Sequence, residues 1–167
     1  TLLSQFWLCE AKMQPCQQSC RSCKEWQAGV HPDFFVVEPP PDKRETGIDQ
    51  IRAATQWSGQ TPRGQRRILL VRRAERLNNA AANAFLKTIE EPSASLSIIV
   101  ATRRLNALPA TIRSRCMQIT LRAPSPEACR QWLEQQHCAR NNIDAAAVLN
   151  PGDVLAALNL NEDEEEC

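Results

Sequence analysis

The sequence predicts an α/β protein with a parallel sheet at its centre. Short runs of apolar and β-branched residues alternate with longer stretches whose apolar residues recur at helical spacing. Parallel strands need crossover connections of this length, and strands inside such sheets read as continuous apolar runs. The strands expected on this basis are residues 34–37, 67–71, 97–101 and 117–121, and the helices between them are 48–57, 74–91 and 111–114.

Local signals mark where several of these elements begin and end. Two helices are expected before the first strand, over residues 2–8 and at 24–29, where Gly29 provides an end. Three prolines close the strand at 34–37, because proline cannot donate to a ladder of hydrogen bonds. The helix at 74–91 is rich in alanine and ends before Pro92. Asn78 or Asn79 is expected to cap it after a break.

Beyond residue 124 the pattern is helical only. Ser125 is expected to cap a helix that continues to residue 138, with Pro126 at its first position. Shorter helices are expected at 144–149 and 152–160. We therefore expect an α/β domain over residues 1–123, part of a small helical lid over 124–160, and an acidic tail over 161–167.

The net charge of +1 conceals an uneven distribution. Residues 162–166 carry five of the 19 acids, so 20 basic residues face only 14 acids in the rest of the chain. Arginines concentrate at 63–76 and 103–122, which indicates either a solvated face or a surface for phosphate or an acidic partner. No apolar run approaches the ~20 residues of a membrane span, and no secretion leader is visible. We expect a cytoplasmic protein.

Four of the eight cysteines form a cluster with the spacing C-x6-C-x3-C-x2-C, namely Cys9, Cys16, Cys20 and Cys23. The disulfide framework of a secreted protein would normally spread its cysteines over the chain. Four thiolates this close match the tetrahedral all-sulfur sites of structural zinc, which leave no position for water. We expect structural Zn²⁺ here, with a redox pair or buried free thiols as the alternative. His31 is not needed as a ligand.

The segment 108–116, LPATIRSRC, places Arg113 and Arg115 between two expected strands. A guanidinium is planar and permanently charged, so an arginine at the end of a strand–helix unit is well placed to bind phosphate. The alternative is an ordinary surface pair with Glu90 or Glu91.

Two features needed for nucleotide hydrolysis are missing from this sequence. Hydrolysis in an α/β protein needs a loop G-x-x-x-x-G-K-[ST] for the phosphates and an acid after an apolar strand for magnesium. The five glycines are too dispersed for that loop, and Arg72 and Arg73 follow the apolar run at 68–71. Two cations there would repel the metal. A phosphate bound by Arg115 is therefore expected to belong to a neighbouring subunit.

Several stretches resemble the clamp-loader branch of the AAA+ proteins: residues 80–92 (AAANAFLKTIEEP), 99–102 (IVAT) and 108–116. The four cysteines and residues 27–33 (QAGVHPD) resemble its bacterial members, although the usual cysteine spacing there is x8, x2, x2. The resemblance covers residues 2–137. It implies an AAA+ (RecA-like) parallel sheet with helices on both faces, a zinc-bearing insertion at 9–23 and a partial helical lid. The strand and phosphate loop that the family places ahead of these elements are missing from this sequence.

Within that family, the arginines at 72 and 73 resemble the non-hydrolysing stator of the bacterial loader. The resemblance implies a subunit without catalysis of its own in a DNA-directed DNA polymerase (nucleotidyltransferase) holoenzyme. Its implied partners in DNA replication are the motor (gamma/tau) and delta subunits, the sliding clamp and primed DNA. Arg115 would reach a neighbour's ATP. Thr102 matches the position of a phosphate-sensing residue in the family's ATPases, but without a nucleotide bound by this chain we expect it to be structural. The alternatives are an ATP-hydrolysing motor subunit of the same loader and a zinc-dependent nucleic-acid-binding module.

Overall fold

The computed structural model describes residues 2–10, 16, 20–121, 125, 127–128 and 130–131. The chain divides into two compact units, residues 1–118 and 119–167. The second unit lies almost wholly outside the described residues, and so do the expected helical lid and acidic tail. None of the described helices has the length and apolar character that crossing a membrane requires.

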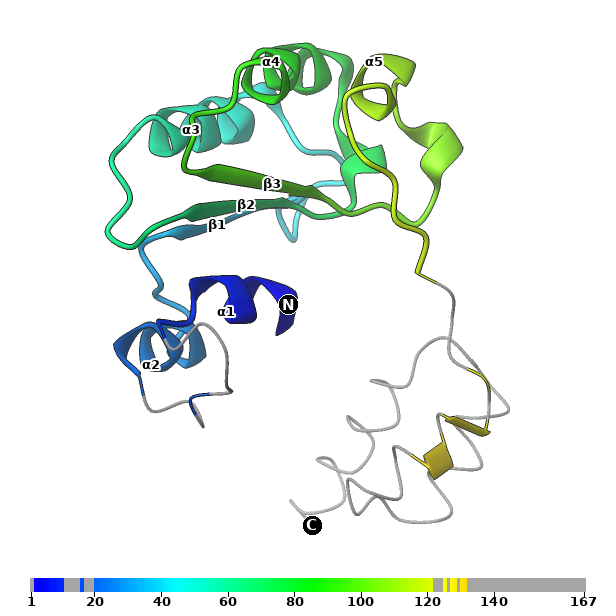
Figure 1. Cartoon of the computed structure of the whole chain (residues 1–167). Helices are drawn as coiled ribbons and strands as arrows, with labels where there is room; N and C mark the ends of the chain where they lie inside the picture. The colour runs from blue at the N-terminus through cyan, green and yellow to red at the C-terminus, as the bar shows by residue number, and fades with distance from the viewer. Residues whose placement is uncertain are drawn as a thin grey trace. The chain divides into compact units, whose positions relative to one another are not determined.

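Three parallel strands form the sheet: β1 (Phe34–Val37), β2 (Arg67–Val71) and β3 (Leu96–Val100), in the order β1-β2-β3 (Figure 1). Ile68 of β2 is in register with Phe34 on one side and Ser97 on the other. Every residue of β2 is buried, as expected of a central parallel strand. The predicted parallel α/β sheet is confirmed.

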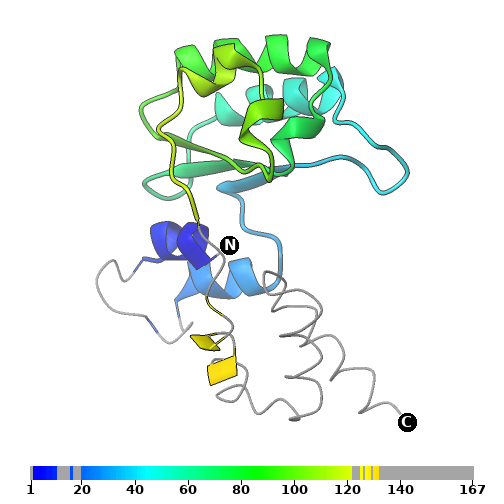
Figure 2. The ribbon, with the colours of Figure 1, turned by 90° about the vertical axis from the view of Figure 1, so that its right-hand side faces the viewer.

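Two helices cover one face of the sheet, α3 (Ile48–Ser58) and α4 (Asn79–Glu90), and both carry an apolar stripe toward it (Figure 1). The core that they share with the strands includes Ile51, Ala54, Leu69, Val71 and Phe85. Two shorter helices, α1 (Leu2–Leu8) and α2 (Arg21–Gln27), lie on the other side of the sheet in both Figure 1 and Figure 2.

The helix expected over 74–91, with a break before an asparagine cap, is present as two elements. A short 3-10 turn, η1 (Ala74–Arg76), comes first and α4 begins at Asn79. The backbone N–H of Asn78 donates to the Thr46 carbonyl at 3.2 Å, which holds the chain extended between the two. The Asn78 side chain then accepts the N–H of Ala81 at 2.8 Å, so the expected asparagine cap is confirmed.

The strand expected over 117–121 is also wrong. After β3 the chain forms a 3-10 turn, η2 (Leu105–Ala107), and a short helix, α5 (Ala110–Arg113), and then becomes irregular. Met117, Ile119 and Leu121 are 86%, 70% and 89% exposed. A strand needs a neighbour to pair its N–H and C=O groups, and no described strand lies beside this segment. The alternation of apolar and polar residues over 117–121 is therefore not sufficient to form a strand.

Candidate functional site

Arg115 lies just after α5, in a segment that two buried side chains hold against the core. Leu108 and Ile112 are both buried in the cluster that contains Phe85 of α4. Cys116 packs against the same cluster, and burial raises the pKa of its thiol. The Ser114 hydroxyl donates to the Thr111 carbonyl at 3.1 Å and closes the turn. The arginine is thus on the surface while the backbone beneath it is anchored.

The guanidinium of Arg115 has three neighbours. Its Nη2 lies 2.7 Å from Glu90 Oε1, and its Nη1 donates to the Thr111 carbonyl at 2.9 Å and the Ser114 hydroxyl at 3.3 Å. Both partners of the ion pair are half-exposed, 40% for Arg115 and 46% for Glu90. The alternative of a surface pair with Glu90 is therefore present in the structure. Arg113 instead contacts Asn106 at 3.4 Å.

Two arginines, Arg72 and Arg73, follow β2 at the edge of the sheet where an acid would be needed to hold magnesium. Arg72 pairs with Glu38 at 3.1 Å. Arg73 has a φ of 50°, the left-handed region that non-glycine residues seldom occupy. A cavity of about 260 Å³ at this edge is lined by a proline and four cations, namely Pro39, Lys43, Arg44, Arg73 and Arg76, which we call the basic cluster. None of the four cations has an acidic partner within 4 Å among the described residues.

Thr102 has a partner within this chain. Its hydroxyl donates to Glu75 Oε2 at 2.7 Å and accepts the backbone N–H of Arg104 at 3.1 Å. Burial acts to raise the pKa of Glu75, but the hydrogen bonds from Thr102 and from backbone N–H groups, with the nearby charge of Arg104, bring it below its ordinary value. Thr102 therefore holds η1 beside the end of β3.

The four cysteines come together around one point. The Cys9 and Cys16 sulfur atoms are 3.3 Å apart, those of Cys16 and Cys23 are 3.4 Å apart, and those of Cys9 and Cys20 are 4.0 Å apart. All four ligand atoms lie within 4.8 Å of one another and could hold a metal ion. Tetrahedral bonds of ~2.3 Å to zinc would separate the sulfurs by ~3.8 Å, so the spacing fits that ion. None of these four cysteines forms a disulfide.

Without a cation these thiols differ strongly in acidity. Hydrogen bonds from the Cys20 backbone N–H and from the Cys9 and Cys23 thiols lower the pKa of Cys16 to about 6, whereas burial raises the pKa of Cys23 to about 12. The Cys20 sulfur also accepts the backbone N–H of Cys23 at 3.4 Å and so caps α2. Because metal ligands must be thiolates, only a bound cation would ionise all four at neutral pH.

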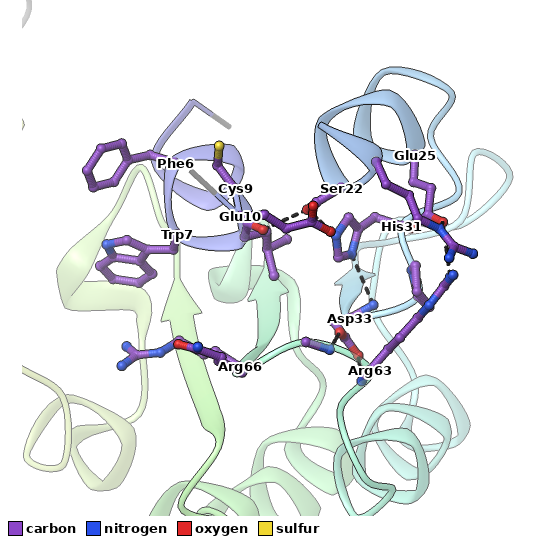
Figure 3. A pocket seen from close by; sticks show the side chains of 15 residues that line it. Phe6, Trp7, Cys9, Glu10, Ser22, Glu25, His31, Asp33, Arg63 and Arg66 are labelled. Atoms are coloured by element: carbon purple, nitrogen blue, oxygen red, sulfur yellow. Dashed lines mark hydrogen bonds and ion pairs between the residues drawn. The ribbon is translucent and has the colours of Figure 1, made fainter. Parts of the chain in front are cut away.

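His31 is fully engaged outside the cysteine cluster (Figure 3). Its Nδ1 accepts the backbone N–H of Asp33 at 3.1 Å, so its proton is on Nε2, which donates to the Ser22 hydroxyl at 2.7 Å. Ser22 in turn donates to the Leu8 carbonyl at 2.6 Å. The imidazole therefore cannot take a proton from Ser22, which rules out a hydrolase-type pair. The chain of hydrogen bonds instead joins α1 and α2 to the start of β1.

These residues border a cavity of about 670 Å³ between α1, α2 and the loop before β2 (Figure 3). Its arginines are already engaged: Arg21 and Arg63 both pair with Glu25, at 2.9 and 3.0 Å, and Arg66 lies 6.0 Å from the Trp7 ring. The remaining wall holds the buried carboxylate of Asp33. Two of its three arginines therefore have an acidic partner in the cavity wall, whereas Arg66 has none within 4 Å among the described residues.

A family model described as "DNA polymerase III, delta subunit" matches residues 1–125. This chain belongs to the DNA polymerase III delta subunit family. The curated DNA polymerase III subunit delta' of Escherichia coli (strain K12) is 36% identical over 162 residues, covering 95% of this chain and 48% of that protein. The subunit delta' of Pseudomonas aeruginosa is 37% identical over 115 residues, covering 68% and 35%. The predicted resemblance is confirmed.

Relatives named as gamma subunits of DNA polymerase III also match. The DNA polymerase III subunit gamma of Buchnera aphidicola is 31% identical over 138 residues, covering 80% of this chain and 36% of that protein. A crystal structure of a gamma subunit-related protein from Thermotoga maritima superposes with a TM-score of 0.56 at 26% identity, covering 75% and 47%. The chain thus spans about half the length, or less, of these family members.

The structure brings together some of the residues that the sequence singled out and separates others. The four cysteines form one cluster, and Arg115 forms an ion pair with Glu90. Arg113 instead contacts Asn106, and Thr102 contacts Glu75. The sequence pattern did not single out Asp33, Ser22 or Arg67, because their partners lie far away along the chain and only the fold brings them together. In this chain the motif 108–116 lies on a surface turn whose backbone is anchored by the buried side chains of Leu108 and Ile112.

Proposed function

We propose that this chain is a delta prime-type stator of the bacterial clamp loader, which helps to load the sliding clamp on primed DNA in the cytoplasm. Its partners would be the motor (gamma/tau) and delta subunits. Arg115 would supply positive charge in trans to ATP bound by the neighbouring motor subunit. The observation that carries this proposal is an exposed guanidinium on an anchored turn, in a chain whose sheet edge carries Arg72 and Arg73 where magnesium ligands would stand.

The physical argument concerns charge. Negative charge develops on the γ-phosphoryl oxygens during transfer, and an arginine placed there from another subunit stabilises it. In GTPase systems such an arginine is worth about 10³ to 10⁵ in rate. The basic residues after β2 disfavour a magnesium–nucleotide complex in this chain, which supports the stator over the motor role. Rapid ATP hydrolysis by the full-length protein alone would favour the motor instead.

The decisive experiment uses the full-length protein in a reconstituted loader with gamma/tau, delta, clamp and primed DNA. Arg115→Ala should lower DNA-dependent ATP hydrolysis at the adjacent site by at least about tenfold and slow clamp loading accordingly. Arg113→Ala is the matched control, since Arg113 is two residues away and contacts only Asn106 among the described residues. Unchanged hydrolysis by an intact Arg115→Ala complex would contradict the proposal.

We further propose that Cys9, Cys16, Cys20 and Cys23 hold one structural Zn²⁺ ion. The sulfur–sulfur spacing supports it, as does the absence of any open position for a substrate. Purified protein should contain about one zinc per chain, and Cys20→Ser should lose most of it. Cys116→Ser is the control because Cys116 packs in the core near α5. Undiminished zinc in Cys20→Ser would remove Cys20 from the site.

A second candidate is direct contact with nucleic acid through the basic cluster. Four cations that have no acidic partner among the described residues line this cavity and favour phosphate oxygens as a ligand. The changes Arg73→Ala and Arg76→Ala should each weaken DNA binding. Each should also reduce the slope of the logarithm of the binding constant against the logarithm of salt concentration by about one, whether or not Arg115 is present. Binding that does not change with salt, or does not respond to these variants, would argue against this candidate.

A further inference from the structure

The ion pair between Glu90 and Arg115 joins two elements that are distant along the chain. Glu90 is the last residue of α4, and Arg115 follows α5. Burial of Phe85, Leu108 and Ile112 in one cluster packs these elements together, with Ile89 and Cys116 at its margin. The position of the carboxylate relative to the guanidinium is therefore set by the core rather than by two freely moving side chains.

The contacts of Arg115 leave part of its guanidinium open. Arginine has five N–H donors. Two of them, on Nη1, are directed to the Thr111 carbonyl and the Ser114 hydroxyl, while Nη2 lies 2.7 Å from Glu90 Oε1 in an ion pair. The Nε–H and at least one Nη2–H have no acceptor among the described residues. These two donors can reach a phosphate while Glu90 keeps its contact.

The stability of the fold does not by itself account for a glutamate at position 90. A carboxylate at the last residue of a helix opposes the helix dipole. A half-exposed ion pair adds little to folding, because solvent screens it and both side chains lose freedom. Among the described residues Arg115 is its only charged partner within 4 Å.

We propose that Glu90 is a positioning residue for Arg115: it holds the guanidinium against α5 and presents the two remaining donors to the neighbouring subunit. This inference rests on the proposed role of Arg115 in trans. A long arginine side chain without this tether would sample many rotamers, and only some of them would reach the phosphate. Loss of the tether should then reduce the rate of hydrolysis without weakening ATP binding, since ATP is held by the motor.

The test is ATP hydrolysis by the reconstituted loader that contains full-length protein. Glu90→Ala should lower kcat at the adjacent site about five- to tenfold with little change in KM for ATP. Glu90→Gln keeps an acceptor oxygen and should lose less. Glu91→Ala, which changes the next glutamate, should match the unmodified protein. Thermal unfolding of Glu90→Ala should shift by no more than about 2 °C, so a merely structural role would not reproduce the kinetic loss.

A double-mutant cycle separates this inference from the role of Arg115 itself. In an Arg115→Ala background, Glu90→Ala should cause no further loss, because the group that it positions is gone. If Glu90→Ala behaves like Glu91→Ala while Arg115→Ala is defective, the positioning role is wrong and the role in trans stands. An equal Glu90→Ala loss in both backgrounds would also overturn it. If Arg115→Ala is fully active, the proposed function fails and this inference fails with it.

Discussion

Asp33 and Arg67 form an ion pair in the interior, with Asp33 Oδ1 3.6 Å from Arg67 Nε. The same carboxylate accepts the backbone N–H groups of Arg63 at 2.9 Å and Gly64 at 2.6 Å, so it fastens the loop before β2 to the start of β1. The guanidinium also donates to the carbonyls of Trp57, near the end of α3, and of Thr61, and lies 4.6 Å from the Trp57 ring. Its Nε makes no hydrogen bond within the described part of the chain, so Asp33 provides its compensating charge.

Removing one member of this pair should be strongly destabilising. Asp33→Ala leaves a buried, uncompensated cation and two unpaired N–H groups, and we expect a loss of about 3–5 kcal/mol in the free energy of unfolding. Urea denaturation of the full-length protein measures it. Asp49→Ala is the control, because Asp49 forms only a surface pair with Arg52 and should change stability by less than about 0.5 kcal/mol. Equal effects of the two variants would contradict this account of the pair.

Acidification should weaken the fold through His31. Burial, the largest influence, lowers the pKa of this imidazole below 6.5, although Asp33 and Glu25 act in the opposite direction. The unfolded chain therefore takes up a proton more readily than the folded chain. The stability that comes from the neutral imidazole is present above pH 6.5 and is lost as the pH falls through the folded pKa. Protonation would also place a second donor against the Asp33 N–H.

Urea midpoints measured from pH 7.5 to 5.0 check this prediction. They should fall more steeply in the unmodified protein than in His31→Gln, because other groups titrate alike in both. Parallel curves would show that His31 does not contribute to the pH dependence.

Metal removal should destabilise α1 and α2 locally while the sheet stays folded. A cation at the four cysteines would tie Cys9, after α1, to Cys23 inside α2. A strong chelator should therefore increase hydrogen exchange over residues 2–10 and 20–30, whereas β2, fully buried, should keep its protection. Added zinc should restore the protection. Uniform loss across β2 would mean that the ion supports the whole domain.

The buried Ile112 should control both stability and the position of Arg115. Ile112→Ala should lower the free energy of unfolding by about 2–5 kcal/mol and Ile112→Val by about 0.5–1.5 kcal/mol. Ile112 belongs to α5 and is fully buried in the cluster that contains Phe85 of α4. The cavity left by the smaller side chain would therefore also free the turn that carries Arg115. Loader ATPase should therefore fall more for Ile112→Ala than for Ile112→Val under conditions where both are folded. A variant that loses stability but keeps full ATPase would show that the turn is held by other contacts.

Much of the fold was visible in local patterns. The runs at 34–37 and 67–71 are strands because they are apolar and β-branched, and prolines, glycines or charges bound them. The helix at 48–58 follows from apolar residues at helical spacing, and Asn78 caps α4 as expected. The motif at 108–116 pointed to the family before any geometry was known. Each of these conclusions depends on interactions between residues that are near in the sequence.

Tertiary structure decided what depends on distant partners. Residues 117–121 alternate like a strand but have no described neighbour to pair with, so they stay irregular and exposed. The pairing of Glu90 with Arg115, the tautomer of His31 and the burial of Asp33 against Arg67 each follow from packing that joins separate elements. Local sequence sets propensity and charge, whereas burial and contact depend on which elements the core brings together.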